Sequence, residues 1–336
     1  SMTSFRLVQS YSGSSVSSPS NAVSWAKVFQ RTPLRSLALD SEATLDWISH
    51  ECPRLPSTLT ELQIPHAEFA VPDIFNWSKM APNLTSLDFG RVFQSEDNLN
   101  TMLAQLPVGL RVLKLEKLGN NDALQRLTRL ELLDVESISK PLSFAQTAAL
   151  SRVLQQLLCR RGTLFTGGDC FKALPNSLTQ LYAEQIGAKV RRDDLQGLPA
   201  SLTSLALPTT LYAKTPLGLC HLTQLKVLNC NIPNLGIDPA DATYDPVENP
   251  LASFPVLEHL TLINVGSVDN SLLDRLPASL RVLIVWNPFP TLLQDSDLDR
   301  LPHLTYLELP ESPRLTQECI QHLPKTLTWN NIRSTH

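Results

Sequence analysis

The sequence is poor in aromatic residues and glycine, and it has no surplus of positive charge. Aromatic residues make up 6% of the 336 residues, and only 12 residues are glycine. Lysine and arginine (28) are slightly outnumbered by aspartate and glutamate (32), which leaves a formal net charge of −4. No run of about 18 apolar residues is present, so the sequence predicts no transmembrane helix. Without a basic surplus, nothing indicates a nucleic-acid-binding protein.

The six cysteines are not clustered, and none belongs to a Cys-x-x-Cys pair. Scattered cysteines are typical of small buried side chains in a reducing compartment. Residues 1–24 are rich in serine and lack the apolar core of a signal peptide. We therefore expect an intracellular, cytoplasmic protein. A secreted or cell-surface location is the alternative, and the Asn-x-Ser/Thr triplets at Asn76 and Asn83 add little to it, because such triplets often arise by chance.

Signatures of catalysis are also missing. The sequence contains no Walker A loop and no Gly-x-Gly-x-x-Gly, His-Glu-x-x-His or Gly-x-Ser-x-Gly motif. The seven histidines are dispersed, and His221, His303 and His322 recur just before expected strands, which indicates turn residues instead of metal ligands. We expect no enzymatic activity, no cofactor and no bound metal.

What is present is a repeated pattern, Leu-x-x-Leu-x-Leu, with a mean spacing of about 24 residues. The first leucines of the copies are Leu34, Leu59, Leu84, Leu110, Leu130, Leu154, Leu178, Leu202, Leu225, Leu257, Leu280, Leu304 and Leu327. One copy cannot bury its three leucines by itself, whereas stacked copies bury them as a continuous core. Leucines at positions 4 and 6, with position 5 facing outward, predict a half-buried strand.

A second motif, Leu-Pro-x-(Ser/Thr)-Leu, precedes several of these strands, as in residues 198–202 and 276–280. Proline ends the preceding segment, because it cannot continue a helix and restricts the residue before it. Short helical patterns such as residues 271–276 come before the proline. Each unit is therefore predicted to contain a strand, a loop, a short helix or 3-10 turn, and a Leu-Pro turn.

These motifs resemble the leucine-rich repeat family, whose period is 20–29 residues. The resemblance covers about residues 34–332. It implies an α/β solenoid, or horseshoe, with a parallel β-sheet on its concave face and short helices or 3-10 turns on its convex face. The Leu-Pro motif is similar to the FNIP-type variant and, less closely, to bacterial effector repeats. The ninth position is rarely asparagine, as Leu118 and Ile138 show, so the backbone groups that asparagine satisfies in many members must be satisfied otherwise.

Two domains are predicted from the position of the repeats. Residues 1–33 precede the first expected strand and should form a flexible segment and a capping helix over 21–30. Residues 34–336 should form the solenoid, with about 12–13 repeats.

Two regions interrupt the solenoid pattern. The spacing between Leu225 and Leu257 is about eight residues too long, with the excess inside 232–253. That excess is either a tolerated surface insertion or an acidic loop that contacts a partner. The helical pattern of residues 144–158 is unusually long for a helix on the convex face.

The outward positions of adjacent strands form ladders spaced about 4.8 Å apart, and two patches emerge on them. One is acidic and suits a basic partner segment or is a solvated charged face; it contains Asp88, Glu116, Asp134, Glu136 and Glu184, with Tyr182 on the same ladder. The other resembles an interface hot spot and contains His259, Ile263, Ile284, Trp286 and Tyr306. We rank the second patch higher, although Trp286 packing under the loop at 288–290 is an alternative.

The resemblance implies a non-enzymatic scaffold that binds a protein partner through the concave face. Alternatives are the substrate-recognition part of a ubiquitin ligase and the ligand-recognition domain of a larger signalling or immune-type receptor. Residues 1–33 are too short for a full F-box domain, which lowers the first alternative. We expect a monomer that binds neither nucleic acid nor membranes.

Overall fold

The computed structural model divides the chain into two compact units. Unit 1 comprises Ser1–Lys140 and Ala149–Gly162, and unit 2 comprises Pro141–Ala148 and Thr163–His336. The structure describes residues 4–7, 33–39, 55–64, 81–89, 96–119, 121–187, 190–208, 216–231, 250–263, 270–286, 291–310, 312–316 and 318–332.

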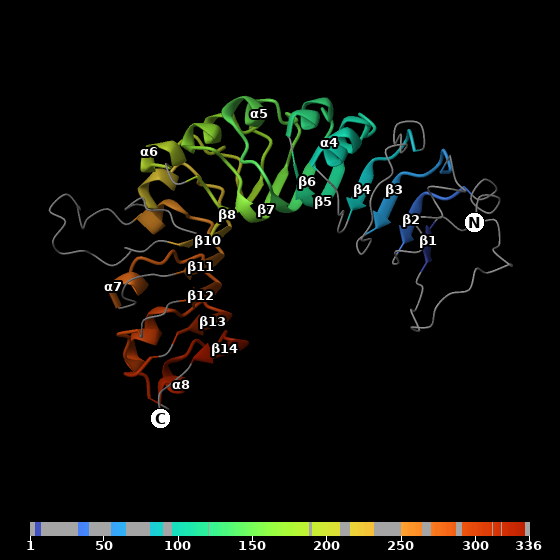
Figure 1. Cartoon of the computed structure of the whole chain (residues 1–336). Helices are drawn as coiled ribbons and strands as arrows, with labels where there is room; N and C mark the ends of the chain where they lie inside the picture. Colours follow the sequence, from blue (N-terminus) through green and yellow to red (C-terminus); the bar gives the residue numbers. More distant parts are fainter. Residues whose placement is uncertain are drawn as a thin grey trace. The chain divides into compact units, whose positions relative to one another are not determined.

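Unit 1 contains short parallel strands that lie side by side in the order of the sequence. They are β1 (Ser4–Leu7), β2 (Ser36–Leu39), β3 (Glu61–Ile64), β4 (Ser86–Phe89), β5 (Val112–Leu118), β6 (Leu132–Ile138) and β7 (Gln156–Thr163). The connections include helix α4 (Glu96–Ala104) and the 3-10 helix η1 (Asn121–Arg126). Figure 1 shows the strands along one side of this unit and α4 along the other.

Unit 2 repeats the same arrangement. Its strands are β8 (Gln180–Gln185), β9 (Ser204–Leu207), β10 (Val227–Asn231), β11 (His259–Ile263), β12 (Val282–Trp286), β13 (Tyr306–Leu309) and β14 (Trp329–Ile332). Its helices are α5 (Phe144–Ala148), η2 (Gly168–Ala173), α6 (Arg192–Leu195), η3 (Pro216–Leu219), η4 (Pro250–Ser253), α7 (Asn270–Leu273), η5 (Asp295–Arg300) and α8 (Cys319–His322). In Figure 1, α7 and α8 lie on the opposite side of the unit from the strands' outward face.

The leucine at position 4 of each copy sets the register of the sheet. In unit 2 these residues pair in the series Leu205, Leu228, Leu260, Leu283 and Leu307. In unit 1 the corresponding series is Leu37, Leu62, Leu87, Leu113, Leu133 and Leu157. All of them are 0% exposed, and burying one leucine side chain contributes about 1.5–3 kcal/mol. The predicted α/β leucine-rich-repeat solenoid is thus confirmed, with a parallel sheet and short helices.

The beginning of the chain differs from our expectation. Strand β1 pairs in parallel with β2, with Phe5 opposite Leu37 and Leu7 opposite Leu39. The first strand therefore lies inside residues 1–33 and not after them. The pattern search missed it because Met2 and Phe5 stand where other copies have the leucines of positions 1 and 4. The capping helix expected over 21–30 lies outside the described residues.

The prediction of a long helix over residues 144–158 is wrong. Helix α5 ends at Ala148, and the chain then turns, with the amide of Leu154 bonded to the carbonyl of Ser151. The Ser151 hydroxyl donates to the carbonyl of Thr128 in the preceding repeat at 2.8 Å, which holds this turn in place. Most of the second interruption, 232–249, lies outside the described residues.

The serine or threonine of the Leu-Pro motif has a clear structural role. Its hydroxyl donates to the carbonyl of the first leucine in the preceding copy. Thr58 donates to Leu34 at 2.8 Å, and Ser279 donates to Leu257 at 2.7 Å. We call this series the hydroxyl ladder. It satisfies backbone acceptors between repeats, the kind of function that the missing asparagine performs in many leucine-rich repeats.

Strands β5 and β6 compensate for the missing asparagine in a second way. They extend to the ninth position, where Leu118 pairs with Ile138. Both side chains are buried, so the aliphatic residues there continue the core.

The described cysteines form no disulfide: Cys159, Cys170, Cys230 and Cys319 are buried free thiols, and Cys220 is half-buried. Burial raises the pKa of Cys230 to about 12, which keeps it a protonated, unreactive thiol. In the described part of the chain, no helix has the length and apolar character needed to cross a membrane.

Candidate binding surfaces on the strand face

Positions 3, 5 and 7 of successive strands form three outward rows in each unit. In unit 1 the row at position 5 contains Asp88, Lys114, Asp134 and Leu158 in register. In unit 2 the same row contains Asn229, Thr261, Ile284 and Glu308. Side chains 20 or more residues apart in sequence are therefore neighbours, and the two expected patches can be compared residue by residue.

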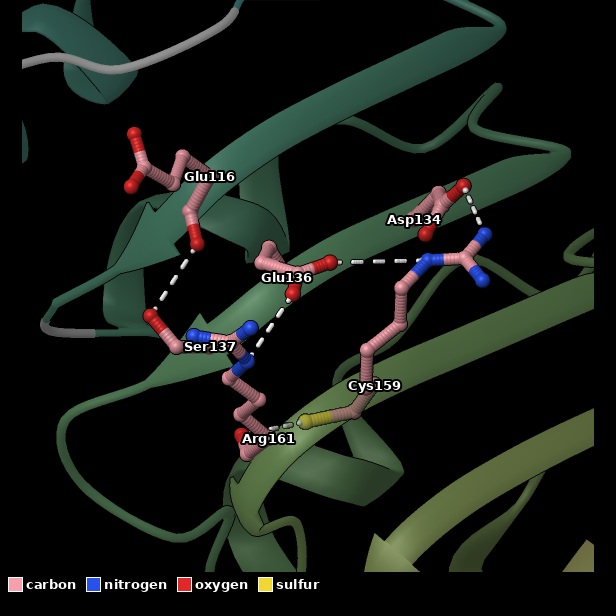
Figure 2. Close-up of polar contacts among 7 residues, drawn as sticks. Glu116, Asp134, Glu136, Ser137, Cys159 and Arg161 are labelled. Carbon is pink, nitrogen blue, oxygen red and sulfur yellow. Dashed lines mark hydrogen bonds and ion pairs between the residues drawn. The ribbon is translucent and has the colours of Figure 1, made fainter.

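The acidic patch of unit 1 contains its own counter-ions. We define the charged surface by Asp88, Lys114, Glu116, Asp134, Glu136, Arg160 and Arg161. The guanidinium of Arg160 lies 3.1 Å from a carboxylate oxygen of Asp134 and 3.7 Å from one of Glu136. Arg161 contacts the other oxygen of Glu136 at 3.1 Å (Figure 2).

Further contacts make this charged surface a self-contained network. Lys114 lies 3.7 Å from Asp88. The Ser137 hydroxyl donates to the carbonyl of Glu116 at 3.1 Å, so it links β6 to β5 (Figure 2). Because three cations face four carboxylates, the surface has little residual attraction for a basic partner. The sequence did not indicate the role of Arg161, because it follows the outward position that Arg160 occupies.

The two remaining residues of the acidic prediction lie elsewhere. Tyr182 and Glu184 belong to β8 in unit 2. Asp88, Glu116, Asp134 and Glu136 lie on β4 to β6 of unit 1. The acidic patch as a binding site stays a prediction.

The second patch lies on strands β11 to β13 of unit 2. We define the aromatic surface by His259, Ile263, Ile284, Trp286, Tyr306 and Glu308. Trp286 is 55% exposed and stands opposite Ile263 in the register of β11 and β12. More than half of the indole is therefore open to solvent, which disfavours packing under a loop; residues 288–290 themselves lie outside the described part.

Glu308 joins the two aromatic residues of this surface. The indole Nε1–H of Trp286 donates to one carboxylate oxygen of Glu308 at 3.3 Å, and the Tyr306 hydroxyl donates to the other at 3.2 Å. Partial burial and this hydrogen bond to Glu308 raise the pKa of Tyr306. The sequence analysis did not include Glu308 in this patch, since the repeat pattern does not show which side chains reach one another.

Unpartnered polar atoms border the aromatic surface on β10. The Oδ1 atoms of Asn229 and Asn231 are buried and accept no hydrogen bond. Asn231 is 6% exposed and Thr261 is 5% exposed, although both occupy outward positions. An unsatisfied buried acceptor costs about 1–3 kcal/mol. Because these two oxygen atoms are buried, a ligand on the aromatic surface does not reach them.

His259 completes this polar border. Its Nε2 lies 3.3 Å from the hydroxyl of Thr261. Burial lowers the pKa of His259, so the imidazole is neutral near pH 7. It therefore adds no positive charge to the surface.

The other histidines examined in the sequence connect neighbouring repeats. His221 Nε2 lies 2.8 Å from the carbonyl of Leu198, and His322 Nδ1 lies 3.0 Å from a carboxylate oxygen of Asp299. His221 lies in a turn, as expected, whereas His322 is the last residue of helix α8. Among the residues that the structure describes, no three His, Cys, Asp or Glu side chains are grouped as metal ligands would be.

Comparisons with known proteins concern the fold. No family model and no curated protein matches this sequence. An internalin from Listeria monocytogenes is similar in structure, with a TM-score of 0.46 and 15% identity over 89% of this chain and 72% of the internalin chain. The leucine-rich repeat-containing protein LegL7 from Legionella pneumophila has a TM-score of 0.37 and 14% identity over 90% of this chain and 88% of its own. At such values neither likeness bears on function, and the FNIP-type variant stays a prediction.

Proposed function

We propose that this chain is a non-enzymatic protein-interaction scaffold and that the strand face of unit 2 binds its protein partner. The observation that supports the proposal is the aromatic surface. Trp286 is 55% exposed between aliphatic neighbours, on a strand whose backbone is paired on both sides. Exposed tryptophan and tyrosine on a rigid framework are the residues most often found at the energetic centre of interfaces.

The cost of binding favours this surface over the charged surface. A partner on the charged surface would have to desolvate ion pairs around Arg160, which offsets much of the energy gained. On the aromatic surface the partner would displace water from Ile263, Ile284 and Trp286, which is favourable. Parallel strands on both sides also limit the backbone entropy lost on binding.

The experiment is capture from native lysate by the wild-type chain and by the double variant Trp286→Ala/Tyr306→Ala. A matched control, Phe144→Ala/Ile320→Ala, removes apolar side chains that are 48% and 70% exposed on helices α5 and α8 of the same unit. All three proteins should melt at similar temperatures. We expect partners captured by the wild type and by the control to be absent with Trp286→Ala/Tyr306→Ala. Equal capture by all three proteins would eliminate this surface.

A further inference from the structure

The outward rows of unit 2 lack positive charge. In β8 to β13 they contain Gln180, Tyr182, Glu184, Ser204, Ala206, Pro208, Val227, Asn229, Asn231, His259, Thr261, Ile263, Val282, Ile284, Trp286, Tyr306, Glu308 and Pro310. None of these is lysine or arginine, two are carboxylates, and burial lowers the pKa of the single histidine. The corresponding rows of unit 1 contain Lys114 and Arg160.

Two cations lie at the margin of these rows. Lys226 lies 4.0 Å from Glu258, and Arg281 donates to the carbonyl of His303 at 3.1 Å. The carboxylate of Glu308 accepts hydrogen bonds from two neutral donors, the Trp286 indole and the Tyr306 hydroxyl. A carboxylate can accept about four hydrogen bonds, so Glu308 retains capacity for a charged donor.

The exposed ring of Trp286 lies beside the carboxylate of Glu308 and suits a cation. The face of an indole attracts positive charge, and tryptophan does so most strongly among the aromatic residues. The same pair of groups selects against an acidic partner.

From these observations we infer that the aromatic surface recognises a basic segment of its protein partner. An arginine or lysine of that segment lies over Trp286 with its charge against Glu308. This inference rests on the proposed function and adds the chemistry of the partner to it.

The test uses three pools of resin-bound peptides with acetylated N-termini. The central residue is arginine, its neutral isostere citrulline, or glutamate, and the flanking positions are equal mixtures of Val, Ile, Thr, Asn, Gln and Gly. We expect the wild-type chain to be retained roughly fivefold or more on the arginine pool compared with the citrulline pool, and least on the glutamate pool. Equal retention on all three pools, or none on the arginine pool, would overturn the inference.

Glu308→Gln tests the charged contact without removing the side chain. We expect it to lower the preference for the arginine pool over the citrulline pool, because only the attraction to the Trp286 ring remains, and to leave retention on the citrulline pool unchanged. Glu184→Gln removes the other carboxylate of the outward rows and should change neither. An unchanged arginine preference in Glu308→Gln would contradict the inference.

The same variant separates this inference from the proposed function. If protein partners in the lysate experiment are lost with Trp286→Ala/Tyr306→Ala but kept with Glu308→Gln, the scaffold function stands and the basic segment is refuted. If both variants keep them, both proposals fail.

Discussion

The strand faces of the two units differ although the strands are built alike. In unit 1, Arg160 and Arg161 satisfy the carboxylates of Asp134 and Glu136 across the β6–β7 pair. In unit 2, acceptors such as Asn231 are buried without a donor, and Trp286 stays exposed. The comparison shows that the number of charges on a repeat face says little about binding. What distinguishes a candidate interface is the set of groups that the protein leaves unmatched.

The largest expected effect tests whether the two units share one kind of core. Leu133→Ala in unit 1 and Leu283→Ala in unit 2 each remove a fully buried position-4 leucine. Each should lower the free energy of unfolding by about 3–5 kcal/mol, since the cavity left behind adds to the lost transfer energy. Urea unfolding followed by circular dichroism measures both. A loss below about 1 kcal/mol in one unit alone would show that the cores are not equivalent.

A smaller effect tests the charged surface. Arg160→Met retains most of the aliphatic volume but removes the contacts to Asp134 and Glu136. Because all three side chains are partly solvated, we expect a loss of about 0.5 kcal/mol at low ionic strength. The loss should shrink in 1 M NaCl, roughly the concentration at which the screening length falls to about 3 Å.

The control for that experiment is Lys226→Met in unit 2, whose contact to Glu258 is long and exposed on both sides. It should change stability less than Arg160→Met does. A loss in Arg160→Met that is independent of salt would mean that packing, and not charge, holds the arginine in place.

The smallest effect concerns His259. Its pKa is lowered by burial in the folded chain, so the unfolded chain takes up a proton first as the pH falls. The folded state therefore loses stability as the pH drops below the ordinary histidine pKa near 6.5. His259→Gln should lose less stability than the wild type between pH 7 and pH 5, as measured by urea unfolding at both values. Identical pH profiles would place the imidazole in solvent in the folded chain.

The sequence was sufficient for the fold because a solenoid depends on spacing. The period of the leucines determines the register, and the register determines which residues share an outward row. The sequence analysis missed strand β1 because its copy lacks leading leucines of the pattern. It also placed the end of α5 wrongly, because a helical pattern does not reveal where a hydrogen bond such as that from Ser151 to Thr128 ends the helix.

The candidate site was less predictable than the fold. The rows could be written down from the sequence, but not the conformations of the side chains on them. Whether Arg160 turns toward Asp134 on one adjacent strand, or Glu308 accepts bonds from Trp286 and Tyr306, depends on reach and orientation across strands. Those contacts determine which charges are neutralised by a neighbour, and the spacing of residues in the sequence does not reveal them.

The hydroxyl ladder has a consequence for how such a chain can change in length. Each rung joins a hydroxyl of one copy only to a carbonyl of the copy before it, as with Ser201 and Leu178. If a gene segment encoding one whole copy with such a hydroxyl were duplicated in tandem, the junction between the two identical copies would again join a hydroxyl to a carbonyl at the same spacing. Growth by duplication would thus preserve the joints between copies, while mutation remains free to alter the outward rows and with them the ligand.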